Sequence, residues 1–456
     1  MIRRLPLLLV VVALALPSTA FALPQFAALS ARQCDNCHVE PFDWKNPELP
    51  ERKCSLNCST CHVNPTGGGM RNTAGVFYGR EILAMFGPRP TDDWQPNAPS
   101  SRPASMPGED EDVTAEVPPH SEPPGPLSAA RYAGMDPTPY FRVGFDVRVM
   151  GYFPEDADNA FFPMQTDLYL AASPYNPGDP TGGRLTFLVN GGFLGSRSEE
   201  FDGFVDRAFV REYWALFDNL PYQLYGKLGQ FLPAFGWRLD DHTAFIRQNQ
   251  TFDNERQVTG FEVGLNPNYL YANASLFIPG PPVTRSRTGT ERFSVLDFDN
   301  GFGTALTAGY RDLWWQAGGS FMFESRDGRS DLWVGANWAL NLHEARHPWS
   351  PVGVAPVVYL GEYDLRHTTD DAAGSKTSLT SFHEVDFLVV EGLFLQMRYD
   401  WMDPDISNAD DHIHRYTVGI VAHPFTSIEV IAQVRFNDEV AKAFNNETLV
   451  QLHAWF

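Results

Sequence analysis

The stretch FRVGFDVRV, residues 141–149, alternates apolar and polar side chains with a period of two. Successive side chains of a β-strand point to opposite faces, so this pattern predicts a strand with one apolar and one charged face. The apolar positions are Phe141, Val143, Phe145, Val147 and Val149. The polar positions are Arg142, Asp146 and Arg148. Such a strand is typical of a membrane barrel with a polar lumen, and alternation alone would also suit a soluble β-sandwich.

The same alternation returns in LFLQMRYDW, residues 393–401, and in SIEVIAQVRF, residues 427–436. From residue 140 to the end we expect about sixteen antiparallel strands. They lie near residues 140–151, 164–174, 184–195, 205–217, 222–231, 257–265, 268–278, 301–310, 313–325, 331–342, 353–365, 377–390, 393–402, 413–422, 427–436 and 447–456. An even number of strands returns both ends of a bacterial barrel to the periplasm.

The C-terminal stretch ETLVQLHAWF, residues 447–456, alternates up to a final aromatic residue, Phe456. It resembles the assembly signal of bacterial outer-membrane barrels, and together with the strand count it favours an all-β transmembrane barrel over a sandwich. The segments NL, NPN, RD, EG and HPFT predict tight turns on one side. Longer acidic connectors, DPDISNADD and HTTDDAAGS, fall on the other side, whereas DGRS and EARHPWS break this rule and leave the count open by two strands.

One long connector, LPAFGWRLDDHTAFIRQNQTFDNE, occupies residues 232–255, between the fifth and sixth expected strands. General sixteen-stranded porins fold their third outer loop into the lumen at this place, and the connector looks similar in position. Its charged residues would then line the pore constriction; they are Arg238, Asp240, Asp241, His242 and Arg247. A loop on the outer surface is the alternative.

The N-terminal residues predict export. Residues 1–22 carry Arg3 and Arg4, an apolar stretch and the small-x-small ending Ala20-Phe21-Ala22, which together predict a signal peptide. Residues 87–136 are acidic and rich in proline, and predict an extended linker before a barrel domain at 137–456. The net charge of −22 argues against nucleic acid as a partner.

All five cysteines lie between Cys34 and Cys61, and four of them form two C-x-x-C-H motifs. A c-type haem needs two thiols for its vinyl groups and an adjacent histidine for its iron, so each motif predicts one covalently attached haem. The attachment residues are Cys34, Cys37, Cys58 and Cys61, with His38 and His62 as axial ligands of the haem iron. Residues 23–86 are therefore expected to form a small, mostly irregular or helical cytochrome domain with two c-type haems.

Two points about these motifs stay open. Met70 follows His62 across the turn Gly67-Gly68-Gly69 and is a candidate sixth ligand, with simple packing as the alternative. The spacing of Cys54, Cys58 and Cys61 also occurs in iron–sulfur and zinc sites. Export argues against an iron–sulfur cluster, because such clusters are assembled in the cytoplasm.

The stretch LPQFAALSARQCDNCH, followed by a periodic barrel, resembles the fused cytochrome–porin family of outer-membrane electron conduits, which includes bacterial iron oxidases. The resemblance rests on Cys34, Cys37, His38 and the terminal Phe456. The family usually carries one haem motif, and this chain has a second one and a long linker. The resemblance implies a place in the outer membrane of a Gram-negative bacterium, with the N-terminal domain in the periplasm or within the barrel.

Electron transfer across the outer membrane is the function that this resemblance implies. The partners would be a periplasmic c-type cytochrome or other carrier, an extracellular metal ion or mineral, and outer-membrane lipid. The direction of flow is open, so the protein would serve oxidation or reduction of a metal such as iron. The alternative is a diffusion porin whose haems act only as a tethered periplasmic electron carrier.

Overall fold

The computed structural model describes residues 58–72, 75–76, 83–86, 140–175, 183–194, 208–239, 241, 243–248, 250, 256–267, 269–279, 301–311, 315–342, 357–390, 392–408, 410–439 and 445–455. The predicted signal peptide, the first C-x-x-C-H motif with Cys34, Cys37 and His38, and the linker at 87–136 lie outside these residues.

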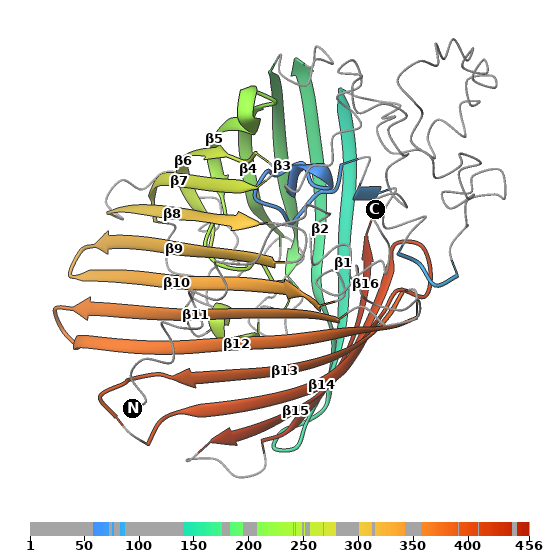
Figure 1. The fold of residues 1–456 in the computed structure, drawn as a ribbon, viewed down its shortest axis with the longest axis vertical. Helices are drawn as coiled ribbons and strands as arrows, with labels where there is room; N and C mark the ends of the chain where they lie inside the picture. The colour runs from blue at the N-terminus through green and yellow to red at the C-terminus, as the bar shows by residue number, and fades with distance from the viewer. Residues whose placement is uncertain are drawn as a thin grey trace, which may run out of the picture.

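The described strands form one closed antiparallel barrel of sixteen strands, drawn in Figure 1 from blue-green β1 to red β16. The strands are β1 (Phe141–Pro154), β2 (Ala160–Tyr175), β3 (Arg184–Leu194), β4 (Ala208–Asp218), β5 (Leu224–Phe231), β6 (Val258–Leu265), β7 (Leu270–Ile278), β8 (Phe302–Arg311), β9 (Trp315–Arg326), β10 (Arg329–Asn341), β11 (Val357–Asp370), β12 (Gly374–Val390), β13 (Leu393–Asp403), β14 (Ile413–Ala422), β15 (Ile428–Glu439) and β16 (Glu447–Trp455).

Each strand pairs with its neighbours in sequence, and the barrel closes where β1 pairs with β16. In this seam Val149 lies opposite Leu452, and Arg148 lies opposite His453. The expected count of about sixteen strands is confirmed. We call the end where β1 begins and β16 ends the terminal rim, and the other end the loop rim.

The alternation along β1 separates the two faces of the barrel wall. Phe141, Val143 and Phe145 are exposed on the outside, whereas Asp146 and Arg148 are buried in the lumen. The same division holds around the barrel, because outward apolar side chains of other strands are exposed as well. They include Leu168, Val189, Leu276, Leu306, Val334, Met397, Val418, Phe436 and Leu452. A soluble sandwich would bury its apolar faces, so an apolar exterior around a polar lumen identifies a membrane barrel.

The expected tight turns at 219–220, 391–392 and 423–426 lie at the terminal rim. One connector was predicted wrongly: most of HTTDDAAGS is strand, because β11 continues to Asp370 and β12 begins at Gly374. The backbone pairing of the two strands continues through this segment, with His367 opposite Thr377. The short turn at Asp327 and Gly328 of DGRS does lie at the loop rim, whereas EARHPWS lies outside the described residues, and the count is sixteen.

Helical structure is sparse among the described residues. The short helix α5 (Phe245–Gln248) lies in the long connector between β5 and β6, and the 3₁₀ turn η4 (Cys58–Thr60) begins the second C-x-x-C-H motif. In the described part of the chain, no helix combines the length and apolar character needed to cross a membrane.

Candidate functional site in the barrel lumen

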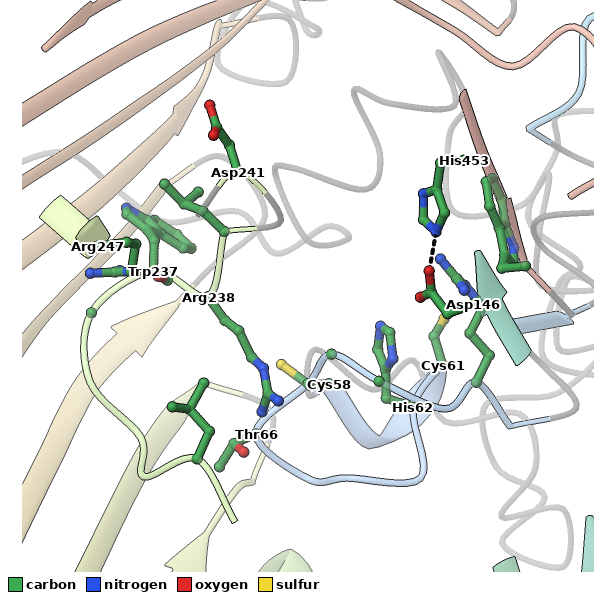
Figure 2. Close-up of a pocket in the computed structure, with 18 of the residues that line it drawn as sticks. Cys58, Cys61, His62, Thr66, Asp146, Trp237, Arg238, Asp241, Arg247 and His453 are labelled. Atoms are coloured by element: carbon green, nitrogen blue, oxygen red, sulfur yellow. Dashed lines mark hydrogen bonds and ion pairs between the residues drawn. The ribbon is translucent and has the colours of Figure 1, made fainter. Parts of the chain in front are cut away.

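The second C-x-x-C-H motif lies inside the barrel. The amides of Cys61 and His62 both donate to the carbonyl of Cys58, at 3.2 and 2.9 Å, and this tight turn brings the three side chains to one side. All three line a luminal cavity, and Figure 2 shows the two sulfur atoms flanking the His62 ring. No disulfide joins Cys58 and Cys61.

The turn after the motif folds back on it. The amide of Gly67 donates to the Asn64 carbonyl at 2.9 Å, and the amide of Val63 donates to the Met70 carbonyl at 3.0 Å. Gly67, Gly68 and Gly69 all have positive φ values, 85°, 71° and 62°. At Gly68 a Cβ atom would collide with the side chain of Arg238. The positive φ and this close contact both favour glycine there. The turn expected from the sequence is therefore present.

Met70 lies in a different environment from His62. Its side chain is 5% exposed and packs in an apolar cluster with Val63 and with Tyr169 and Trp214 of the wall. Met70 is not among the residues that line the cavity, whereas His62 is. Its role as a sixth ligand stays a prediction, and this arrangement favours the packing alternative.

The cavity has a volume of about 540 Å³. Pockets for cofactors commonly span about 300–1,000 Å³. Arg148, Arg211, Arg238 and Arg311 contribute positive charge to its lining. Burial raises the pKa of the Cys58 thiol, and the nearby Arg311 and Arg238 guanidinium groups act against that rise. The cavity thus offers two thiols, an imidazole and cationic groups to one ligand.

The connector between β5 and β6 folds into the lumen and contacts the wall opposite. The Trp237 amide donates to Glu362 Oε2 of β11 at 2.6 Å, and Arg247 Nη2 lies 3.1 Å from the same carboxylate. Farther along, Asp241 Oδ2 lies 2.6 Å from Arg398 Nη1 of β13. The luminal position expected for this connector is therefore confirmed for Arg238, Asp241 and Arg247, while Asp240 and His242 lie outside the described residues.

The ion pairs of Asp241 control its protonation. Burial acts to raise the pKa of this carboxyl, but the Arg435 and Arg398 guanidinium groups outweigh burial and hold the pKa well below its ordinary value. The connector is thereby fixed to the wall by a carboxylate that stays charged. In Figure 2 Arg238 and Asp241 extend from this connector on the side of the cavity away from His453.

A luminal histidine that the sequence analysis did not single out closes the barrel seam. His453 of β16 lies 2.7 Å from Asp146 Oδ1 of β1 through Nε2, and 2.9 Å from Glu429 Oε2 of β15 through Nδ1. The dashed line in Figure 2 marks its bond to Asp146. The alternation of Val450, Leu452 and Ala454 already places His453 on the polar face of the last strand, and that signal could have identified it.

Among the residues that the structure covers, no cluster of three His, Cys, Asp or Glu side chains is arranged to hold a metal ion. No protein-family model matches the chain, and no curated protein matches it.

Several solved outer-membrane proteins have a similar fold. A loop-deletion mutant of OmpT, an outer membrane protein of Vibrio cholerae, matches with a TM-score of 0.51 and 10% identity, over 69% of this chain and 99% of that one. An anion-selective porin from Comamonas acidovorans matches with a TM-score of 0.49 and 12% identity, over 69% and 99%. At this identity the OmpT likeness shows the fold alone, which is that of a porin-like outer-membrane barrel.

Proposed function

We propose that this protein carries electrons across the outer membrane through a c-type haem held inside its barrel. The observation that carries the proposal is the position of Cys58, Cys61 and His62, which line a cavity in the lumen. The apolar band of a membrane barrel is about 25 Å tall, too thick for direct transfer between a periplasmic donor and an extracellular acceptor. A haem inside the lumen would divide the electron transfer across this band into shorter steps.

The residues present fit a haem. The thiols of Cys58 and Cys61 line the cavity and would form thioether bonds to the vinyl groups, and His62 would bind the iron. The cavity has the volume of a cofactor pocket, about 540 Å³. Arginine pairs well with carboxylates. Arg148, Arg211 and Arg238 already pair with Asp146, Asp167 and Glu212, so the haem propionates would share these guanidinium groups with the wall. The haem, when bound, would supply the one-electron chemistry, and the chain would position and insulate it.

The first motif would carry a second haem at Cys34 and Cys37, with His38 on its iron. About 20 residues separate His38 from Cys58. A fully extended chain of that length reaches at most about 70 Å, which sets the greatest distance between the two attachment sites. The two haems would then be two carriers attached to the same polypeptide within that distance.

The partners follow from the resemblance to fused cytochrome–porin conduits. The terminal rim would face the periplasm, where a c-type cytochrome or another carrier would exchange electrons with the haems. The loop rim would face the exterior and an extracellular metal ion or mineral. This rim carries acidic residues that would attract metal cations; the described ones include Asp370, Asp371, Asp403, Asp405, Asp410 and Asp411. The protein would then serve oxidation or reduction of a metal such as iron.

The test uses purified full-length protein in liposomes that contain a trapped redox dye, with an impermeant reductant added outside. We expect bleaching of the dye by the haem-loaded protein. His62→Ala should abolish bleaching, because it removes an iron ligand in the lumen. His367→Ala is the matched control, since this histidine lies on β11 toward the loop rim and bonds Thr377. Haem reduction without dye bleaching would leave only the tethered periplasmic carrier.

A further inference from the structure

The N-terminal segment contacts several strands of the barrel wall. In the turn after the motif, Asn64 Oδ1 accepts a hydrogen bond from Lys227 Nζ of β5 at 3.3 Å. Lys227 is fully buried, pairs with Glu262 of β6 at 2.7 Å, and lies over the Phe231 ring. A buried lysine that bonds both the wall and the segment fixes the position of this turn.

Apolar and cationic contacts extend this attachment. Val63 and Met70 pack in one cluster with Tyr169 and Trp214, so the side chains of the segment are part of the same core as the wall. Arg71 then places its guanidinium 4.5 Å from the centre of the Trp455 ring, near the end of β16. The segment thus contacts neighbouring strands on both sides of the seam, from β5 through β4 and β2 to β16.

The described residues 83–86 attach to the terminal rim. Leu83 packs against Leu388 of β12 and Phe394 of β13. The amide of Met85 donates to the His423 carbonyl at 2.7 Å, and the amide of Phe86 donates to the Pro424 carbonyl at 3.0 Å. The chain is therefore held to the turn between β14 and β15 by backbone bonds.

The connector between β5 and β6 covers the segment from the other side. Arg238 of this connector contacts the backbone at Gly68 and pairs with Glu212 of β4 at 3.3 Å. The connector is itself fixed across the lumen by the pairs of Asp241 and Arg247. Two segments of the same chain thus meet in the interior of the barrel.

From these contacts we infer that the described residues 58–72 and 83–86 form a plug that closes the barrel to hydrophilic solutes. This function is distinct from electron transfer and does not depend on a bound haem. A barrel closed to ions would let an electron carrier work inside the lumen without an ion leak beside it. The plug belongs to the barrel interior through its packing, its charges and its backbone bonds.

The test is the ionic conductance of the full-length protein in planar bilayers with potassium chloride. The reference protein carries Cys58→Ser and Cys61→Ser, which prevents attachment of the second haem and keeps the segment. We expect this protein to stay closed. A second protein, in which residues 58–72 are replaced by glycine and serine at equal length, should conduct steadily. Folding of both is checked by the heat-dependent mobility of the barrel in electrophoresis.

If the replacement protein does not fold, Arg71→Ala with Leu83→Ala decides the question. These changes remove one cation–π contact and one packed side chain, so opening events should become more frequent by more than about tenfold. Arg329→Ala is the control, because Arg329 lies at the start of β10 and pairs with Asp331. Steady conductance of the reference protein, or unchanged conductance after release of the segment, would overturn the plug.

The plug and the proposed electron transfer can fail separately. A closed barrel that attaches no haem at Cys58 and Cys61 would support the plug and reject the luminal haem. An open barrel that attaches the haem would reject the plug alone.

Discussion

Asp241, on the connector between β5 and β6, lies 2.8 Å from the guanidinium of Arg435 on β15. The same carboxylate reaches Arg398 on β13, so one residue of the connector joins two strands of the opposite wall. This contact holds the connector across the lumen, where it also contacts the segment that carries the second C-x-x-C-H motif.

Asp241→Asn should release this part of the connector. The amide cannot replace two ion pairs, and two arginines of the wall are left facing each other, so we expect a loss of about 2 kcal/mol in the free energy of unfolding. Denaturant titration of the folded barrel measures it. Asp371→Asn, in the exposed turn between β11 and β12, is the matched control and should change little. Equal losses for the two variants would contradict the conclusion that Asp241 fixes the connector to the wall.

The stabilisation by Asp241 should depend on pH only in acid. Because the arginines hold the pKa of folded Asp241 well below the ordinary value of 3.8, the carboxylate contributes its full stability above that value. The contribution is lost as the pH falls through the lowered pKa of the folded state. The difference in unfolding free energy between the wild type and Asp241→Asn should therefore be constant at neutral pH and shrink below about pH 4. A difference that already declines between pH 8 and pH 6 would assign the effect to another group.

The sequence predicts the barrel well because its strands have a strict period of two. Phe141, Val143 and Phe145 face outward as expected, and the tight turns fall where the alternation stops. The ends of β11 and β12 were misjudged because their polar residues, such as Thr368 and Asp370, were interpreted as a loop. A strand near a rim needs no apolar side chains.

The site is less predictable, since its contacts join residues that are far apart in sequence. The motif itself predicts Cys58 and Cys61 as haem attachment residues and His62 as an iron ligand. No local pattern indicates that Asn64 bonds Lys227 or that Arg71 lies over Trp455, because these pairs form only once the barrel has closed around the segment. The place of the motif in the lumen therefore comes from the structure alone.

Gly68→Ala tests the close contact between the segment and the connector. Alanine there must adopt a φ near +71° and must also displace Arg238. Gly374→Ala is the matched control, because its φ is +83° and nothing lies within 4 Å of the added Cβ. The backbone cost, about 1–2 kcal/mol, should be shared by both variants. We expect Gly68→Ala to lose more unfolding free energy than Gly374→Ala; equal losses would mean that the contact with Arg238 contributes nothing.

His453→Ala should weaken the barrel seam. The imidazole bridges Asp146 of β1 and Glu429 of β15, and its removal leaves two luminal carboxylates without this partner. Removing one partner of buried hydrogen bonds costs about 1–3 kcal/mol, so unfolding of the barrel should begin at lower denaturant concentration. His414→Ala, on the outer face of β14, gives the comparison for loss of an imidazole alone. If both variants unfold together, the seam does not depend on His453.

Haem content tests the two motifs independently. If each motif attaches one haem, Cys58→Ser with Cys61→Ser should halve the haem absorbance per chain, and Cys34→Ser with Cys37→Ser should halve it as well. The four-serine variant should contain none. Peptide mapping by mass spectrometry identifies which motif keeps its haem. The protein loaded only at Cys58 and Cys61 should resist reduction by a bulky reductant, because this haem would be enclosed by the barrel. Loss of all haem from either double variant would show that the motifs do not act as independent attachment sites.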